Sequence, residues 1–224
     1  MSDSMYNLAY RGDMSALKSR LSAGTHVDEV DSYGSTALHG ACRAGKDEIL
    51  DLLMSHSPHL DRPRQVCGNT ALHLACVNKH ISCVKKLLQA GATVGVGNNW
   101  GGTPLHYAGS GEVVQVLMDH GGDLSVRGQS GSTPLHVVCG FNRLSSAQVM
   151  LEHPVDVNAR DVKGDTPLMC AVRWGSRVGD LLPLVKLLCH HQADVSVCDN
   201  DGKDVLCLAV EKKLTEIVDF LKGM

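Results

Sequence analysis

The chain has 224 residues, of which 43% are hydrophobic and 20% are charged, and this balance is typical of a folded globular protein rather than a disordered one. Its 21 Lys and Arg against 24 Asp and Glu give a formal charge of −3, which argues against a nucleic-acid-binding protein, because such proteins carry a basic surplus. No apolar run approaches the roughly 18 residues that span a bilayer, and the N-terminus lacks the pattern of a signal peptide, so we expect no membrane insertion.

One short motif recurs along almost the whole chain at nearly constant spacing. It reads TALHGA from Thr36, TALHLA from Thr70, TPLHYA from Thr103, TPLHVV from Thr133 and TPLMCA from Thr166. Weaker copies lie near the two ends, DSMYNLA from Asp3 and DVLCLA from Asp204. The steps from Thr36 onward are 34, 33, 30, 33 and 38 residues. A period of this size indicates an array of similar structural units.

Each unit is predicted to hold two short helices. Thr at the start of the motif supplies an N-cap, Pro a preset first turn, and a glycine ends the first helix at Gly12, Gly45 and Gly175. The second helices are predicted from apolar residues at helical spacing in EILDLL (48–53), SCVKKLL (82–88), EVVQVLM (112–118) and LVKLL (184–188). Such short helices cannot bury an apolar face alone, so neighbouring units must stack around one core.

We therefore expect a single domain, residues 3–224, of about seven units: 3–35, 36–69, 70–102, 103–132, 133–165, 166–203 and 204–224. The fourth unit lacks three residues after Tyr107-Ala108, which clips its first helix to about two turns and predicts a notch flanked by Asn78 and Phe141. The sixth carries about five extra residues, Ser176–Asp180, which predict a protruding loop. A functional role and neutral sequence drift explain this deletion and this insertion equally well.

The repeated units resemble the ankyrin repeat family. The match rests on the Thr-Pro/Ala-Leu-His motifs, the glycines after the first helices, the second-helix segments, and unit ends such as QAGATV, DHGGDL and HHQADVSVCDNDGKD. It covers nearly the whole chain. The resemblance implies an all-α repeat solenoid of stacked helix–turn–helix units with projecting β-hairpin loops.

The histidines of the motif are predicted to be structural. Four of them occupy one position of the repeat, namely His39, His73, His106 and His136. A catalytic residue has no reason to recur at a fixed period, whereas a structural hydrogen-bonding residue does. We expect each ring to bond backbone or Thr hydroxyl groups of a neighbouring loop.

No catalytic, cofactor or metal site is predicted. Cys and His are zinc ligands, and four of them lie close together in the sequence at Cys189, His190, His191 and Cys198. Their spacing matches no zinc motif, so the pattern favours a packed thiol beside two exposed imidazole rings. The Gly-rich segment 91–102 is predicted to be a hairpin, because a phosphate cradle needs a preceding buried strand. No nucleophile-elbow, P-loop or metalloprotease motif is present.

The nine cysteines are predicted to be free thiols. Their number is odd and their spacing is unpaired, which fits a reducing compartment. Cys42, Cys76 and Cys139 share a position at which the family usually has Ala, so they are expected to be small core residues. We therefore expect the cytoplasm as the location, with the nucleus as a second compartment.

The resemblance implies that a partner binds in the concave groove lined by hairpin tips and by the ends of the first helices. Five of the eight aromatic residues fall on such positions, and aromatic and Arg side chains dominate binding hot spots. The candidate set is Tyr10, Arg11, Tyr33, Arg43, Asn78, Trp100, Phe141, Arg173 and Trp174. Trp100, Phe141 and Trp174 are the expected anchors, with Arg43 and Arg173 orienting a protein or peptide that carries apolar and acidic groups.

The predicted function is a protein–protein interaction module, a scaffold, adaptor or regulator that is a monomer on its own and has no enzymatic activity. One alternative is the substrate-recruiting part of a larger ubiquitin-ligase or enzyme complex. Ankyrin chains of that kind often carry a C-terminal box, for which the end at Met224 leaves no room, although a fragment of a longer chain would also end without a cap. A second alternative is a substrate of asparagine hydroxylation at Asn158, the clearest match to the family's hairpin Asn.

Overall fold

The computed structural model describes residues 3–175 and 179–224, and all regular secondary structure in these residues is helical. The chain forms two compact units. Unit 1 runs to Pro104 and includes Val116–Gly122, whereas unit 2 consists of Leu105–Gln115 and Asp123–Met224. The boundary therefore falls within the fourth predicted repeat, and the single domain over 3–224 remains a prediction.

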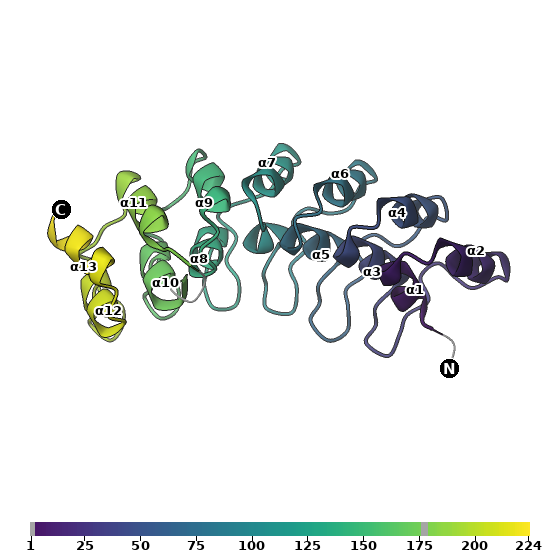
Figure 1. The fold of residues 1–224 in the computed structure, drawn as a ribbon, viewed down its shortest axis with the longest axis horizontal. Coiled ribbons are helices and arrows are strands. Elements are labelled where there is room, and N and C mark those ends of the chain that lie inside the picture. The colour runs from purple at the N-terminus through teal and green to yellow at the C-terminus, as the bar shows by residue number, and fades with distance from the viewer. Residues whose placement is uncertain (1–2, 176–178) are drawn as a thin grey trace. The chain divides into compact units, whose positions relative to one another are not determined.

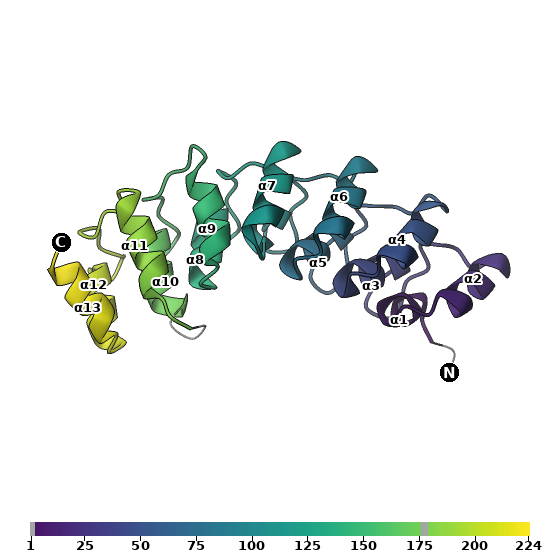
Figure 2. The same ribbon diagram turned by 45° about the horizontal axis from the view of Figure 1, so that its top comes forward.

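Unit 1 holds three complete helix pairs: α1 (Met5–Arg11) with α2 (Met14–Ser22), α3 (Ala37–Ala44) with α4 (Asp47–Met54), and α5 (Ala71–Val77) with α6 (Ile81–Gln89). The first helices of these pairs lie side by side in one row and the second helices in another (Figure 1 and Figure 2). Gly40 allows α1 to approach α3 closely, because a Cβ atom there would lie 2.4 Å from the carbonyl oxygen of Tyr6. Buried leucines such as Leu50 and Leu72 fill the space between the rows.

Unit 2 repeats this plan with α8 (Pro134–Gly140) and α9 (Leu144–Leu151), α10 (Pro167–Trp174) and α11 (Leu182–His190), and α12 (Val205–Glu211) and α13 (Thr215–Lys222). Its core is built from the same positions, including the fully buried Leu135, Met150 and Leu168. The 3-10 helix η1 (Pro104–Tyr107) and α7 (Gly111–Asp119) are divided between the two units. The stacked helix pairs confirm the predicted helical repeat solenoid.

The Thr36, Thr70, Thr133 and Thr166 copies of the motif start their helices with a reciprocal cap. In the Thr70 copy, the His73 Nδ1 atom accepts the backbone N–H of Thr70 at 3.2 Å and lies 2.9 Å from its hydroxyl oxygen. The His73 Nε2–H donates to the carbonyl of Gly102 in the following hairpin at 2.9 Å. His136 bonds Thr133 and the carbonyl of Asp165 in the same way. Both partners thus belong to the histidine's own repeat, 70–102 or 133–165, with the carbonyl in the hairpin at its end.

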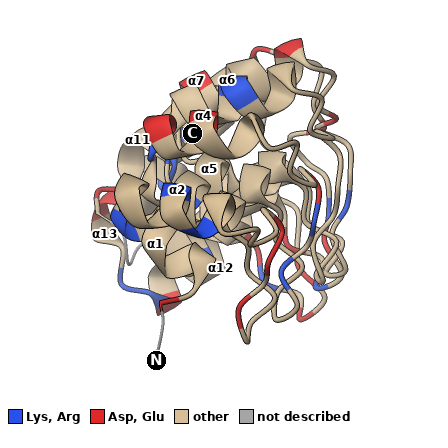
Figure 3. Ribbon diagram, turned by 90° about the vertical axis from the view of Figure 1, so that its right-hand side faces the viewer, with Lys and Arg blue, Asp and Glu red and all other residues tan. Residues whose placement is uncertain are grey.

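The loops between units are hairpins without regular strands in the described residues. An Asx side chain organises the turns at Asp31, Asn98, Asp161 and Asp199: Asp31 Oδ1, for example, accepts the N–H groups of Tyr33 and Ser35, both at 2.8 Å. Within each of the two compact units, single backbone hydrogen bonds link the hairpins of adjacent repeats, as from Gln65 N–H to the Tyr33 carbonyl at 3.2 Å. Charged residues of both signs lie along these loops (Figure 3). The predicted projecting hairpins therefore form, but neighbouring hairpins are joined by single backbone hydrogen bonds and not by a continuous β-ladder in the described residues.

One local prediction needs correction. The first helix of the short repeat is not two α-helical turns but the four-residue η1, because the three-residue deletion removes its last turn. Gly175 ends α10 as predicted, but with a φ of −69°, whereas Gly12 and Gly45 end α1 and α3 in the left-handed conformation. The predicted extra loop spans residues 176–180, and residues 176–178 of it lie outside the described residues.

None of the helices in residues 3–175 and 179–224 combines the length and apolar character that crossing a membrane requires.

Candidate functional site

The five aromatic residues singled out from the sequence are exposed, as expected. The exposed fractions of these residues are 43% for Tyr10, 59% for Tyr33, 55% for Trp100, 53% for Phe141 and 43% for Trp174. Large apolar side chains left in solvent are more informative than buried ones, because folding gains nothing from exposing them. The structure groups some of these rings into pockets and leaves others apart.

Phe141 and Trp174 line one hollow in unit 2, here called the aromatic pocket. It has a volume of about 400 Å³ and is lined by Ser132, His136, Val137, Gly140, Phe141, Cys170 and Trp174. The C-terminal ends of α8 and α10 supply the two rings, and Gly140 leaves the space between them open. A Cβ atom on Gly140 would lie 3.8 Å from the Cβ of Trp174, an ordinary contact. The absence of a side chain at Gly140 is therefore what keeps the pocket hollow.

Cations border the aromatic pocket. The Lys163 Nζ lies 5.8 Å from the centroid of the Trp174 ring, and the Arg143 Cζ lies 5.0 Å from that of Phe141. The guanidinium of Arg143 also bonds the backbone, because its Nη1 donates to the carbonyl of Tyr107 at 2.8 Å. The rim thus offers positive charge around an apolar hollow.

Arg173 is held inside the protein by two acids. Its Nη2 lies 2.8 Å from Asp165 Oδ1 and 2.7 Å from Asp199 Oδ2, and both carboxylates are almost fully buried. Burial raises the pKa of Asp165, and the adjacent guanidinium opposes this shift. Two ion pairs within unit 2 neutralise the charge of Arg173. The sequence-based prediction that Arg173 orients a ligand therefore needs correction, because its guanidinium is already bound.

A second hollow, in unit 1, is here called the tyrosine–arginine pocket. It has a volume of about 510 Å³ and is lined by Asp3, Ser4, Tyr6, Asn7, Asp31, Ser32, Tyr33, Arg43 and Arg64. It brings together the predicted Tyr33 and Arg43. Tyr6 and Arg64 were missed by the sequence analysis, although both sit near repeat positions where a groove would be expected.

The remaining predicted residues lie outside these two hollows. Tyr10 stacks on Tyr6 with ring centroids 6.1 Å apart, and Arg11 pairs with Asp3. The Asn78 side chain donates to the Leu74 carbonyl at 2.8 Å. Trp100 sits at a hairpin tip of unit 1, where its backbone N–H donates to Asn98 Oδ1 at 3.0 Å.

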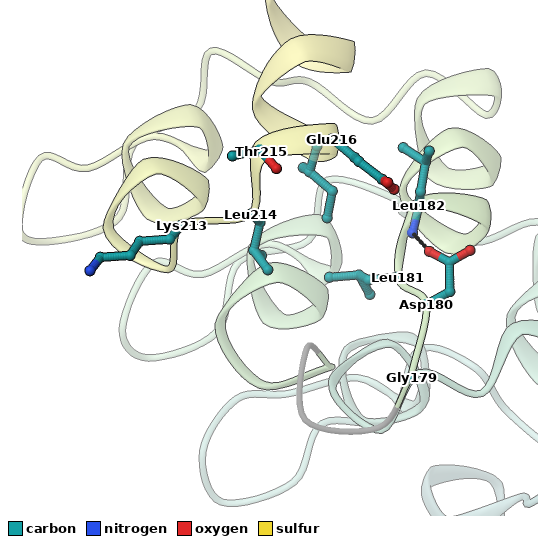
Figure 4. A pocket seen from close by; sticks show the side chains of 9 residues that line it. Gly179, Asp180, Leu181, Leu182, Lys213, Leu214, Thr215 and Glu216 are labelled. Atoms are coloured by element: carbon teal, nitrogen blue, oxygen red, sulfur yellow. Dashed lines mark hydrogen bonds between the residues drawn. The ribbon is translucent and has the colours of Figure 1, made fainter.

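A third hollow in unit 2 lies between the N-terminal ends of α11 and α13, with a volume of about 280 Å³ (Figure 4). Leu181, Leu214 and Ile217 give it an apolar floor, and Glu216 and Lys213 stand at its edge. Asp180 Oδ1 accepts the backbone N–H of Leu182 at 3.0 Å, which caps the start of α11. The hollow borders the predicted insertion, but it joins none of the exposed aromatic residues.

The groups considered for metal binding are engaged with the protein. The His190 and His191 rings meet edge to face at 5.6 Å, while Cys189 is half-buried and Cys198 exposed. Within the described chain, the cluster that brings three potential metal ligands together is Asp161, Asp165 and Cys170. Asp161 Oδ1 accepts the N–H of Asp165 at 2.9 Å, and Asp165 is paired with Arg173.

Asn158 bridges two loops with both ends of its amide. Its Nδ2 donates to the carbonyl of Gln192 at 3.2 Å, and its Oδ1 accepts the N–H of Asp194 at 2.8 Å. Asp28 and Asp61 accept the backbone N–H groups of His59 and Thr93 at the matching positions. This position therefore joins successive repeats through hydrogen bonds between their loops.

Comparison with known proteins places these features in a family. A family model for ankyrin repeats in three copies matches residues 5–98, 52–128, 90–161 and 109–197. Human ankyrin repeat and SOCS box protein 11 is 32% identical over 113 residues, which are 49% of this chain and 34% of that protein. The chicken nuclear factor NF-kappa-B p105 subunit is 33% identical over 136 residues, 56% of this chain and 14% of that protein. The chain thus aligns with about a third or less of these relatives' length.

Solved structures agree over almost the whole chain. The crystal structure of the human ASB11 ankyrin repeat domain superposes with a TM-score of 0.80 at 26% identity, covering 92% of this chain and 91% of that one. The ankyrin repeat domain of Bcl-3, a member of the IkappaB protein family, gives a TM-score of 0.72 at 27% identity and covers 99% of both chains. The chain therefore belongs to the ankyrin repeat family, whose repeat domains are protein–protein interaction modules and are generally not catalytic.

Proposed function

We propose that this chain is a recognition module without catalytic activity, and that a partner protein binds it by placing an apolar side chain in the aromatic pocket. The supporting observation is a hollow of about 400 Å³ between two exposed rings, Phe141 and Trp174. Burying such rings yields a large apolar gain, and aromatic residues in pockets form most binding hot spots. Folding does not require this exposed pair, so binding is the better reason for its presence.

The proposed partner segment carries acidic residues beside its apolar anchor. Lys163 and Arg143 border the pocket, while Arg173 is already neutralised. Unit 1 carries exposed predicted residues of its own, which are available to a partner independently of the aromatic pocket, namely Tyr10, Arg11, Tyr33, Arg43, Asn78 and Trp100. We place this monomeric module in the cytoplasm, with the nucleus as a second compartment, since it has nine free thiols.

The experiment selects binding peptides from a random library displayed on phage and measures their affinity for the purified chain. We expect a consensus of one large apolar residue flanked by Asp or Glu. Trp174→Ala should weaken binding at least tenfold, because truncating a hot spot costs about 2 kcal/mol or more. Melting temperature should hardly change, because the ring is already exposed.

Gly140→Leu provides a sharper second variant. It keeps both rings but fills the pocket, and a side chain there meets no close backbone contact. It should therefore also abolish peptide binding without destabilising α8. Val210→Ala, at an exposed apolar position on α12, is the matched control and should bind as wild type. Undiminished binding by Trp174→Ala and Gly140→Leu would place the interaction elsewhere.

A second function is favoured by the names of the relatives, several of which join ankyrin repeats to a SOCS box. In that case these repeats would be the substrate-recruiting part of a longer ligase or enzyme complex. The natural transcript distinguishes the two: an open reading frame that encodes a further box would support this alternative, and one limited to the repeats would support a free-standing module.

A further inference from the structure

The tyrosine–arginine pocket of unit 1 holds two cations in fixed orientations. Arg43 extends from the end of α3, where its Nη1 donates to the hydroxyl of Tyr6 at 3.1 Å and its Cζ lies 5.7 Å from the ring of Tyr10. Arg64 extends from the following hairpin, where its Nε donates to Ser35 Oγ at 2.8 Å and its Cζ lies 5.8 Å from the Tyr6 ring. Tyr6 therefore contacts both guanidiniums and holds them at one hollow.

Neither of these two cations forms an ion pair with the described residues. Both acids that line the pocket are engaged elsewhere: Asp3 pairs with Arg11, and Asp31 accepts the N–H groups of its own hairpin. In the described part of the chain, no carboxylate lies within ion-pair distance of Arg43 or Arg64. Arg173 in unit 2 shows the contrast, since two buried acids satisfy it.

The pocket also offers an aromatic wall. Tyr33 lies at the hairpin tip with 59% of its surface exposed, and it lines the same hollow as the two arginines. An exposed ring beside preoriented guanidiniums can stack on a ligand ring while Arg N–H groups bind the attached anion. The free Arg N–H donors suit a group with several acceptor oxygens.

We propose that the tyrosine–arginine pocket binds a phosphoryl group on a side chain of a partner protein, preferentially phosphotyrosine. A phosphoryl group carries close to two negative charges and three strong acceptor oxygens, which matches two guanidiniums better than the single charge of a carboxylate does. This inference depends on the proposed function only in taking the ligand to be part of a partner protein. It concerns unit 1, whereas the aromatic pocket lies in unit 2.

The test titrates the full chain with four five-residue peptides, Gly-Gly-X-Gly-Gly, in which X is phosphotyrosine, phosphoserine, Tyr or Glu. Binding is followed by calorimetry and by the NMR signals of the Arg side-chain Nε–H groups. We expect the phosphotyrosine peptide to bind at least tenfold more tightly than the Glu peptide and to shift the signals of Arg43 and Arg64. The phosphoserine peptide should bind less tightly, because it lacks the ring that stacks on Tyr33.

The variants Arg43→Gln and Arg64→Gln should each weaken phosphotyrosine binding at least tenfold, with unchanged melting. Arg62→Gln is the matched control, because Arg62 lies in the same hairpin as Arg64 but does not line the pocket. Equal binding of the Glu peptide, or full binding by both pocket variants, would overturn the proposal. Gly140→Leu separates the two sites: it should leave phosphotyrosine binding intact, whatever happens to binding at the aromatic pocket.

Discussion

His39 differs from the other motif histidines in having one ring nitrogen without a hydrogen-bond partner among the described residues. His73, His106 and His136 each donate Nε2–H to a hairpin carbonyl, whereas His39 keeps only its bonds to Thr36. Burial, and then the positive charge of Arg64, lower the pKa of His39 to about 4. Burial also lowers the pKa of His136. Burial in the motif thus favours the neutral form of His39 and His136.

This neutral form makes stability depend on pH. The folded-state pKa of His39 lies below the unfolded value of about 6.5, so the unfolded chain binds more protons between these values. Its contribution is complete above pH 6.5 and is lost as the pH falls towards 4. We expect the free energy of unfolding to drop by about 2 kcal/mol from this residue alone between pH 7.5 and 5.

Urea unfolding at the two pH values measures this loss. His39→Gln removes the titrating ring but retains the cap, because Gln at this position can accept the N-cap N–H. The variant should therefore lose less stability on acidification than the wild type does. An identical pH dependence in both proteins would show that His39 does not titrate as described.

At the scale of the element, the short repeat shows how a deletion is accommodated. Its first helix is reduced to η1, which leaves the carbonyls of Tyr107 and Ala108 without a continuing turn. Arg143 Nη1 donates to both, at 2.8 and 3.3 Å, and Ser146 Oγ donates to Ala108 at 3.0 Å. Burial lowers the pKa of the Arg143 guanidinium. Side chains of the next repeat thus satisfy the backbone groups that the missing residues would have bonded.

The short repeat should be the first part of the array to open. In a repeat protein each unit contributes its own stability and that of its interfaces, and this unit has the shortest helix and two glycines, Gly109 and Gly111. Amide hydrogen exchange should be faster across 103–132 than in the repeats starting at Thr70 and Thr166. Arg143→Met should lower local protection in 105–115 further, by about 1–3 kcal/mol, because it leaves buried carbonyls without donors.

Lys212→Met, at an exposed position just after α12, serves as the control and should leave the exchange pattern unchanged. Uniform protection across all repeats of the wild type, or no response to Arg143→Met, would contradict this account of the short repeat.

Across the whole molecule, the cysteines divide into inert and accessible groups. All nine are free thiols, and Cys42, Cys76 and Cys139 are fully buried at one position of the first helices. Burial raises the pKa of Cys76 and Cys139, which keeps these thiols protonated and unreactive. Cys198 lies exposed in a hairpin.

Thiol labelling of freshly prepared protein without reductant should therefore proceed in two phases. A small fast fraction should include Cys198 in the native state, and a total of nine should react after denaturation, which matches the cysteine count. Cys198→Ser should remove one thiol from the fast fraction and leave the others unaffected. Recovery of several disulfides would contradict the proposed reducing compartment.

Sequence patterns predict the helical repeats, the caps at their start, the burial of the Ala-like cysteines and the exposure of five aromatic residues. These features were predictable because each depends on a pattern within one unit, and repetition displays that pattern several times. A position that recurs as Thr in five repeats or as His in four has one structural explanation, and the structure supplies it at Thr70 and His73.

The availability of charged side chains, in contrast, depends on tertiary contacts that the sequence pattern does not reveal. Arg43 and Arg173 look equivalent in sequence, yet Arg173 is neutralised by Asp165 and Asp199 while Arg43 is not paired with an acid in the described residues. The sequence likewise gave no sign that Arg143 bonds the backbone carbonyl of Tyr107 in the shortened repeat. The physical reason is that a long flexible side chain takes its direction from partners that are distant in sequence. The Tyr107 carbonyl lies 36 residues from Arg143, and Asp199 lies 26 residues from Arg173. Such partners differ from one repeat to the next.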